Sequence, residues 1–156
     1  MRLFCGVMML TCSGVAMLAG NNAPYPKEKV AEFVVEKLDV TTLPPAIRPK
    51  REKGKKTFGD YGYATRQVDE KEALVEAAPG GAQISIRILE QEASGIYVCA
   101  GNTAKDESNG HIQRALLLKL KESSGLLKSR ESSKEFNSCP VIGGTDDSDA
   151  AAASSY

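Results

Sequence analysis

The chain has 156 residues, which is room for one domain, and its 20 basic and 20 acidic residues give a formal net charge of zero. This balance excludes a global attraction to nucleic acid or to anionic membranes, so an electrostatic partner would need a local patch. Aromatic residues make up only 6% of the chain and tryptophan is absent, which disfavours a surface for stacking sugars or bases.

Residues 1–20 have the pattern of a secretory signal peptide. Arg2 precedes a mainly apolar stretch, and the small residues Ala19 and Gly20 follow it, where we expect cleavage. A membrane anchor is the alternative, but polar residues at 11–14 interrupt the apolar run, which is short for a span. We therefore expect a secreted or periplasmic protein with no membrane span in its mature chain.

Export determines how the cysteines are interpreted. Cys5 and Cys12 leave with the leader, so the mature chain keeps Cys99 and Cys139. Two cysteines in an oxidising compartment usually pair, and this disulfide would contribute on the order of 3 kcal/mol by closing a loop of about 40 residues. Metal binding and a catalytic thiol are the alternatives. The sequence has no Cys-x-x-Cys or His-x-x-x-His spacing, so we expect neither a metal nor a cofactor.

Residues 21–42 form an N-terminal helical segment. Apolar residues recur there at helical spacing and Pro26 suits a first turn, which predicts an amphipathic helix of about three turns within residues 24–38. We expect its apolar face to pack on the rest of the domain.

Residues 43–56 interrupt this pattern as a Pro-rich, basic linker. Three prolines exclude a helix or a central strand, and six cations then fall within nine residues, opposed only by Glu52. The cations are Arg48, Lys50, Arg51, Lys53, Lys55 and Lys56. The strip is either a solvated connector or a docking site for a polyanion. We favour the connector, because no aromatic residue interleaves the charges.

Residues 57–142 carry the β-rich domain. Period-two alternation predicts a first strand over residues 57–68, whereas residues 69–78 fit either a capped helix or a strand that ends at Pro-Gly-Gly, and we favour the strand. Three apolar runs in residues 82–121 predict three further strands. Beyond them we expect irregular structure or one short strand, tied back through Cys139. Short turns between successive strands imply antiparallel pairing.

The predicted fold class is therefore mainly β, with α+β as the alternative. It is an antiparallel β-meander that forms a small sheet or sandwich, with one N-terminal amphipathic helix. Residues 143–156 have nothing to bury, and we expect that tail to be disordered.

Catalytic candidates are few. His111 is the one histidine and stands next to an Asn-Gly reversal signal, where an exposed side chain is expected. Glu76, Glu90 and Glu92 could approach one another across strands as an acid–base pair.

We therefore expect a non-catalytic binding or structural module that contacts either a polyanion or another envelope or extracellular protein. The alternatives are a small secreted carboxylate-dependent enzyme, assisted by His111, and a polyanion binder acting through residues 48–56.

Overall fold

The structure, a computed structural model, describes residues 24–103 and 112–141. The predicted signal peptide, His111 and the tail from residue 143 lie outside the described residues. The elements are α1 (Val30–Lys37), the 3-10 turn η1 (Val40–Thr42), β1 (Ala64–Val68), β2 (Glu72–Glu76), β3 (Gln83–Glu92), β4 (Gly95–Thr103), β5 (Ile112–Lys121) and β6 (Leu126–Glu131). In the described part of the chain, no helix is long and apolar enough to cross a membrane.

The six strands of the described chain form one antiparallel sheet in which each strand pairs with the next, in the order β1-β2-β3-β4-β5-β6. The predicted mainly β fold and its meander topology are confirmed. The ambiguous residues 69–78 contain β2, so the helix alternative is wrong there. Ala73 and Val75 of β2 alternate into the core, and the ladders to β1 and β3 satisfy the backbone on both sides.

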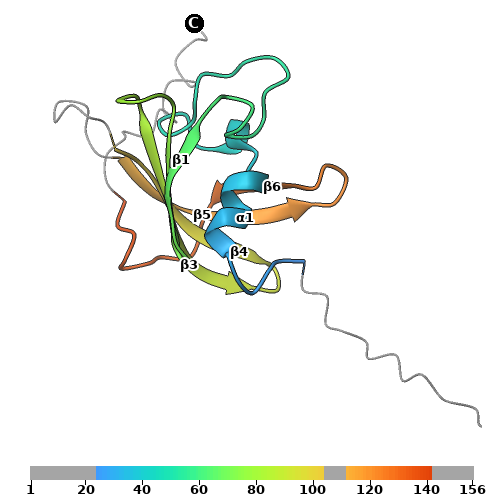
Figure 1. Cartoon of the computed structure of the whole chain (residues 1–156). Helices are drawn as coiled ribbons and strands as arrows, with labels where there is room; N and C mark the ends of the chain where they lie inside the picture. The colour runs from blue at the N-terminus through green and yellow to red at the C-terminus, as the bar shows by residue number, and fades with distance from the viewer. Residues whose placement is uncertain (1–23, 104–111, 142–156) are drawn as a thin grey trace, which may run out of the picture.

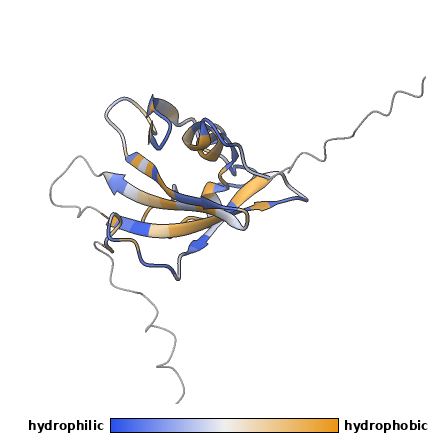
Figure 2. Ribbon diagram, turned by 90° about the horizontal axis from the view of Figure 1, so that it is seen from below, coloured by the Kyte–Doolittle hydropathy of each residue, from blue (hydrophilic) through white to orange (hydrophobic). Residues whose placement is uncertain are grey.

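Helix α1 covers the inner face of this sheet, as Figure 1 shows. The helix contacts β2 and β3 and also β6, so the sheet curves around it. In Figure 2 the hydrophobic colouring is concentrated in the helix and strands, while the connecting segments are mainly hydrophilic. The inner-face residues of the strands are apolar and buried: Ala73, Val75, Ile84, Ile86, Ile96, Val98, Ala100, Leu116, Leu118 and Leu127.

Helix α1 is shorter than predicted, with 8 residues that begin at Val30. Lys29 precedes it with a φ of 53°, a left-handed conformation through which a right-handed helix cannot extend. Residues 24–28 form no helix, and among them Tyr25 packs on the core. The buried Tyr25 accepts a hydrogen bond from the backbone N–H of Leu120 at 3.2 Å.

The first strand is also shorter than predicted, because residues 57–63 form a turn ahead of β1. Phe58 is only 1% exposed, and its ring contacts that of Tyr63 with centroids 5.5 Å apart. Asp60 closes the turn by accepting hydrogen bonds from the backbone N–H groups of Lys56 and Thr57, at 2.9 and 2.8 Å. The aromatic residues that suggested a strand therefore fill one end of the core.

The chain that follows α1 runs beside β6. Leu38 forms a parallel bridge with Leu127, and the backbone N–H of Asp39 donates to the carbonyl of Leu127 at 2.8 Å. At η1 the hydroxyl of Thr42 accepts a hydrogen bond from the backbone N–H of Ser129 at 2.9 Å. These contacts join the N-terminal segment to the last strand of the meander.

Strand β3 contains a bulge at Leu89. Ile88 pairs with Val98 and Glu90 pairs with Tyr97, so Leu89 has no partner residue in β4. The extra residue changes which side chains face outward. Glu90 lies opposite the outward-facing Tyr97, and Gln91 lies on the inner side, where its amide donates to the carbonyl of Pro26 at 3.0 Å.

Candidate functional site

Residues 132–141 cross the outer face of the sheet, the face away from α1, and we call this segment the strap. Cys139 in the strap and Cys99 in β4 lie at disulfide-bonding distance, with their Cα atoms 5.7 Å apart. The guanidinium of Arg87 in β3 donates to the carbonyl of Ser138. The rings of Tyr97 and Phe136 pack with centroids 5.4 Å apart. The predicted cysteine pair therefore belongs to a wider set of contacts that hold the strap.

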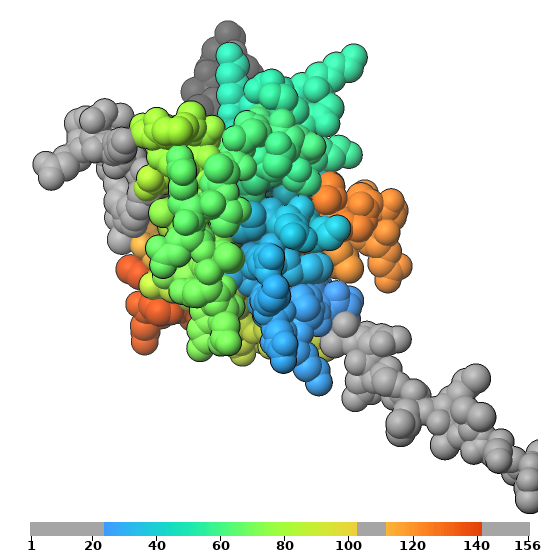
Figure 3. Space-filling model, viewed as in Figure 1, coloured from blue at the N-terminus to red at the C-terminus, as the bar shows by residue number. Residues whose placement is uncertain are grey.

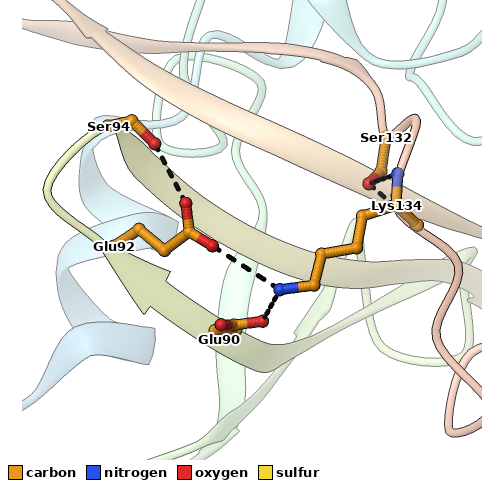
Figure 4. Close-up of polar contacts among 5 residues, drawn as sticks. All are labelled: Glu90, Glu92, Ser94, Ser132 and Lys134. Carbon is orange, nitrogen blue, oxygen red and sulfur yellow. Dashed lines mark hydrogen bonds and ion pairs between the residues drawn. The ribbon is translucent and has the colours of Figure 1, made fainter.

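Two of the predicted carboxylates meet the strap at Lys134, as Figure 4 shows. The ammonium of Lys134 forms an ion pair with Glu90 and lies 3.5 Å from Glu92 Oε1. It also lies 5.3 Å from the ring centroid of Tyr97. Ser94 donates a hydrogen bond to the second oxygen of Glu92 at 3.2 Å. The hydrogen bond to Glu90, and then the charges of the two carboxylates, raise the pKa of Lys134.

This cluster is poorly arranged for hydrolysis. In a glycoside hydrolase the scissile bond lies between the two carboxylates. Here Lys134 occupies the space between Glu90 and Glu92, and its contacts with Tyr97 and Phe136 keep it there. We interpret the cluster as a structural ion pair that fixes the strap.

Glu76, the third predicted carboxylate, lies at the opposite end of β3 from Glu90 and Glu92. It pairs with Gln83 at the β2–β3 turn, and its side chain is only 7% exposed. The backbone N–H of Gly80 donates to it at 2.8 Å, and Arg66, the bulged residue of β1, forms an ion pair with it. These two contacts, in that order, hold the pKa of Glu76 below its usual value. The structure therefore brings together Glu90 and Glu92 but not Glu76.

A groove of about 440 Å³ lies between the strap and the edge of β5. Strand β5 pairs with β6 only from Leu116 onward, which leaves the earlier part of β5 beside the strap. The charged residues that line the groove have both signs, with Arg114 and Lys134 opposed by Glu131 and Glu135. The groove therefore has no charge preference that would indicate a ligand.

The predicted basic strip forms a loop, residues 48–56, that is attached to the core near η1. The backbone N–H of Val40 donates to the carbonyl of Lys56 at 2.8 Å, and the guanidinium of Arg51 donates to the carbonyl of Thr41 at 2.9 Å. The hydroxyl of Tyr61 accepts a hydrogen bond from the backbone N–H of Glu52 at 3.0 Å. Figure 3 shows side chains of this segment projecting from the body of the molecule.

The cations of the loop differ in their partners. Lys55 forms a 2.8 Å ion pair with Glu52 and lies 5.4 Å from the ring centroid of Tyr61. The guanidinium of Arg51 is hydrogen-bonded to the carbonyl of Thr41. The remaining four side chains have no charged or hydrogen-bonding partner among the described residues. They are Arg48, Lys50, Lys53 and Lys56.

Two contributions were missed by sequence reasoning. Lys134 reaches Glu90 across 44 residues, and no local pattern marks such a contact. Tyr61 lies outside the basic strip in sequence, yet the turn at residues 57–63 brings its ring against Lys55.

Among residues 24–103 and 112–141, no group of three or more His, Cys, Asp or Glu side chains is placed to hold a metal ion. Comparison with known proteins gives no match: no family model, no curated protein and no solved structure matches the chain.

Proposed function

We propose that this protein is an exported, non-catalytic binding module whose basic loop, residues 48–56, binds an acidic polysaccharide. One observation carries the proposal: four of the six cations in an anchored loop have side chains with no charged or hydrogen-bonding partner among the described residues. Like charges held together cost free energy unless a counter-charge relieves them, and a polyanion supplies that counter-charge.

The anchoring of the loop supports binding rather than mere connection. A solvated connector requires no contacts of its own, whereas this loop is attached through Lys56, Arg51 and Glu52. A loop that is ordered before it meets a ligand loses less conformational entropy on binding. The unpaired cations are therefore presented in a defined arrangement.

The surroundings of the loop favour a polysaccharide over nucleic acid or a membrane. Single-stranded nucleic acid binds by stacking bases on aromatic rings, but the ring of Tyr61 is already covered by Lys55. Insertion into a membrane needs exposed apolar side chains. The exposed large hydrophobic residues of the described chain are Val68 and Val141, which lie outside the loop. Sulfated or carboxylated sugars require only the charges that the loop provides.

The side chains on both faces of the sheet support the non-catalytic part of the proposal. The buried strand side chains of the inner face are apolar, so they provide no acid or base for catalysis. On the outer face, Lys134 separates Glu90 from Glu92. The carboxylate-dependent enzyme therefore has less support than the binding module.

Retention on immobilised heparin tests the proposal. We expect the mature protein to be retained at about 50 mM salt and eluted as the salt concentration rises, since charge–charge attraction is screened by salt. Replacing Lys50, Lys53 and Lys56 by Gln should abolish retention. A wild-type protein that flows through at this salt concentration would overturn the proposal.

A matched variant separates the loop from net charge. Lys27, Lys37 and Lys71 are also exposed, and their replacement by Gln removes the same three charges elsewhere. This control should still be retained on heparin, and equal loss in the two triple variants would contradict a role for the loop. Labelled single-stranded DNA and phosphatidylserine vesicles serve as competing ligands. Tighter binding to either than to heparin would contradict the choice of a polysaccharide.

A further inference from the structure

A hollow of about 260 Å³ lies where the basic loop meets β6. Arg48, the first cation of the loop, lines one side, and Arg130 of β6 lines the other. Pockets for drug-sized ligands usually measure about 300–1,000 Å³, so this hollow suits one small group rather than an extended molecule. It adjoins the groove beside the strap at Glu131, the one residue that lines both spaces.

The walls of the hollow are fixed to each other. Arg48 follows a turn in which its own backbone N–H and that of Ile47 both donate to the carbonyl of Pro44, at 3.0 and 2.9 Å. Opposite this turn, the hydroxyls of Thr42 and Ser129 lie 3.0 Å apart and link η1 to β6. The two arginines therefore extend from supports that are hydrogen-bonded together.

Neither arginine side chain has an ion-pair or hydrogen-bond partner among the described residues. Guanidinium groups bind oxyanions through paired N–H donors, and they do so best where water is partly excluded. The buried Leu43 and Leu116, each at most 1% exposed, contribute apolar wall to the hollow. Such a wall strengthens a charge interaction by lowering the local dielectric constant.

One opposing charge lines the hollow. Glu131 lies beside Arg130 in β6 and lines the same space, but it forms no ion pair within 4.0 Å of either arginine. With two cations and one anion, the lining keeps a net positive charge. Removing the negative charge of Glu131 therefore tests whether the hollow binds an anion.

We infer that this hollow is a subsite for a single sulfate group, bound by Arg48 and Arg130. The subsite extends the footprint of the basic loop from residues 48–56 onto β6. The identity of the whole ligand, a sulfated polysaccharide, rests on the proposed function, whereas the binding of the sulfate group rests on the hollow itself.

Titration of the isotope-labelled mature protein with inorganic sulfate tests the subsite. We expect saturable amide shifts at Arg48, Ser129 and Arg130 in the NMR spectrum. Arg48→Gln and Arg130→Gln should each weaken this binding about tenfold or more, since each removes hydrogen bonds to a charged group. Both side chains project from exposed or half-exposed positions, and an unchanged thermal midpoint would show that the variants remain folded.

Lys128→Gln is the matched control. Lys128 is exposed, lies two residues before Arg130 in the same strand and does not line the hollow. Its replacement should leave the sulfate shifts intact. Equal weakening by Lys128→Gln, or sulfate shifts that do not saturate, would overturn the subsite.

Glu131→Gln should tighten sulfate binding severalfold, because it removes the one negative charge that lines the hollow. Unchanged affinity in this variant would place the sulfate elsewhere and contradict the inference.

The two proposals fail differently. Heparin retention without sulfate binding in the hollow would overturn the subsite and leave the basic loop as the binding site. Sulfate binding in the hollow without heparin retention would overturn the proposed polysaccharide ligand and leave the subsite standing.

Discussion

The two faces of the sheet are covered in opposite ways. On the inner face, α1 and the turn at residues 57–63 bury a continuous apolar core, in which many side chains share the stabilisation. On the outer face, the strap is held by a few specific contacts: the Cys99–Cys139 pair, one ring contact, the ion pairs of Lys134 and a hydrogen bond from Arg87. The inner face therefore determines whether the chain folds, whereas the outer face determines whether one segment stays attached.

This difference leads to distinct expectations for substitutions. An apolar contact on the inner face is coupled to its neighbours through packing, so its loss affects the whole domain. A contact on the outer face can be lost while the six-stranded sheet persists. Substitutions on each face therefore test that distinction.

The largest effect is expected at Leu118, which is fully buried on the inner face opposite Ile96. Leu118→Ala removes buried methyl groups and leaves a cavity, which costs about 2–5 kcal/mol. Urea denaturation measures the loss in the free energy of unfolding. Leu126→Ala, at a half-buried position in β6, is the control and should lose less. Equal losses would contradict the dominance of the inner face.

Removing the disulfide should cost about 3–4 kcal/mol, because the unfolded chain gains the entropy of an open loop of about 40 residues. The variant replaces Cys99 and Cys139 by Ala together. In hydrogen exchange, the strap should lose protection through local opening, whereas the β3–β4 ladder should lose only the amount set by the lower free energy of global unfolding. Loss of protection in the ladder beyond that amount would show that the outer face is also essential to the fold.

Gly95, the first residue of β4, tests close packing between neighbouring strands. A Cβ atom there would lie 2.6 Å from both the outward-facing Leu117 side chain and the backbone carbonyl of Leu118. Gly95→Ala should therefore cost about 1–3 kcal/mol through overpacking. Gly59→Ala is the control, since its nearest contact would be 3.8 Å away. Thermal unfolding of both variants decides the comparison, and matching midpoints would refute the steric argument.

Glu76 should make the free energy of unfolding depend on pH. Its pKa in the folded protein lies below its ordinary value of 4.5, so the unfolded chain takes up a proton first as the pH falls. The stabilisation that the ionised Glu76 contributes is complete well above pH 4.5 and is lost as the pH falls through and below that value. The free-energy difference between wild type and Glu76→Gln should therefore shrink on acidification. A constant difference between about pH 7 and pH 3 would contradict this linkage.

The smallest effect is expected for Lys134→Met, because the ion pairs it removes are about 40% exposed and surface pairs contribute little. The change should loosen the strap without altering the sheet, and it should matter less at high salt. A loss as large as that of Leu118→Ala would show that the cluster is more than a surface ion pair.

Much of the fold follows from local patterns in the sequence. Alternating isoleucines in β3 and leucines in β5 indicate one buried face, and the Pro-Gly-Gly turn indicates that residues 69–78 contain a strand. Paired cysteines follow from the expected export. These features depend on residues close together in the chain or on simple counting, which is why they could be predicted.

The remaining features depend on contacts between distant segments. The start of α1 depends on the left-handed backbone of Lys29, and the buried position of Phe58 depends on a turn that no alternation reveals. The hollow between Arg48 and Arg130 brings together residues that are far apart in the sequence. Such juxtapositions follow from the register and curvature of the sheet, which local sequence patterns do not reveal.

The bulge at Leu89 has a consequence for how this chain should be aligned with any relative. Leu89 is an inserted residue that the sheet absorbs, since its neighbours Ile88 and Glu90 pair with the consecutive residues Val98 and Tyr97. A relative that lacks it would form a regular strand and keep every flanking side chain on its present face. The expected difference between such sequences is therefore a one-residue gap in the middle of a strand. An ungapped alignment would place Glu90 and Glu92, the carboxylates that contact the strap, on the inner face of the sheet.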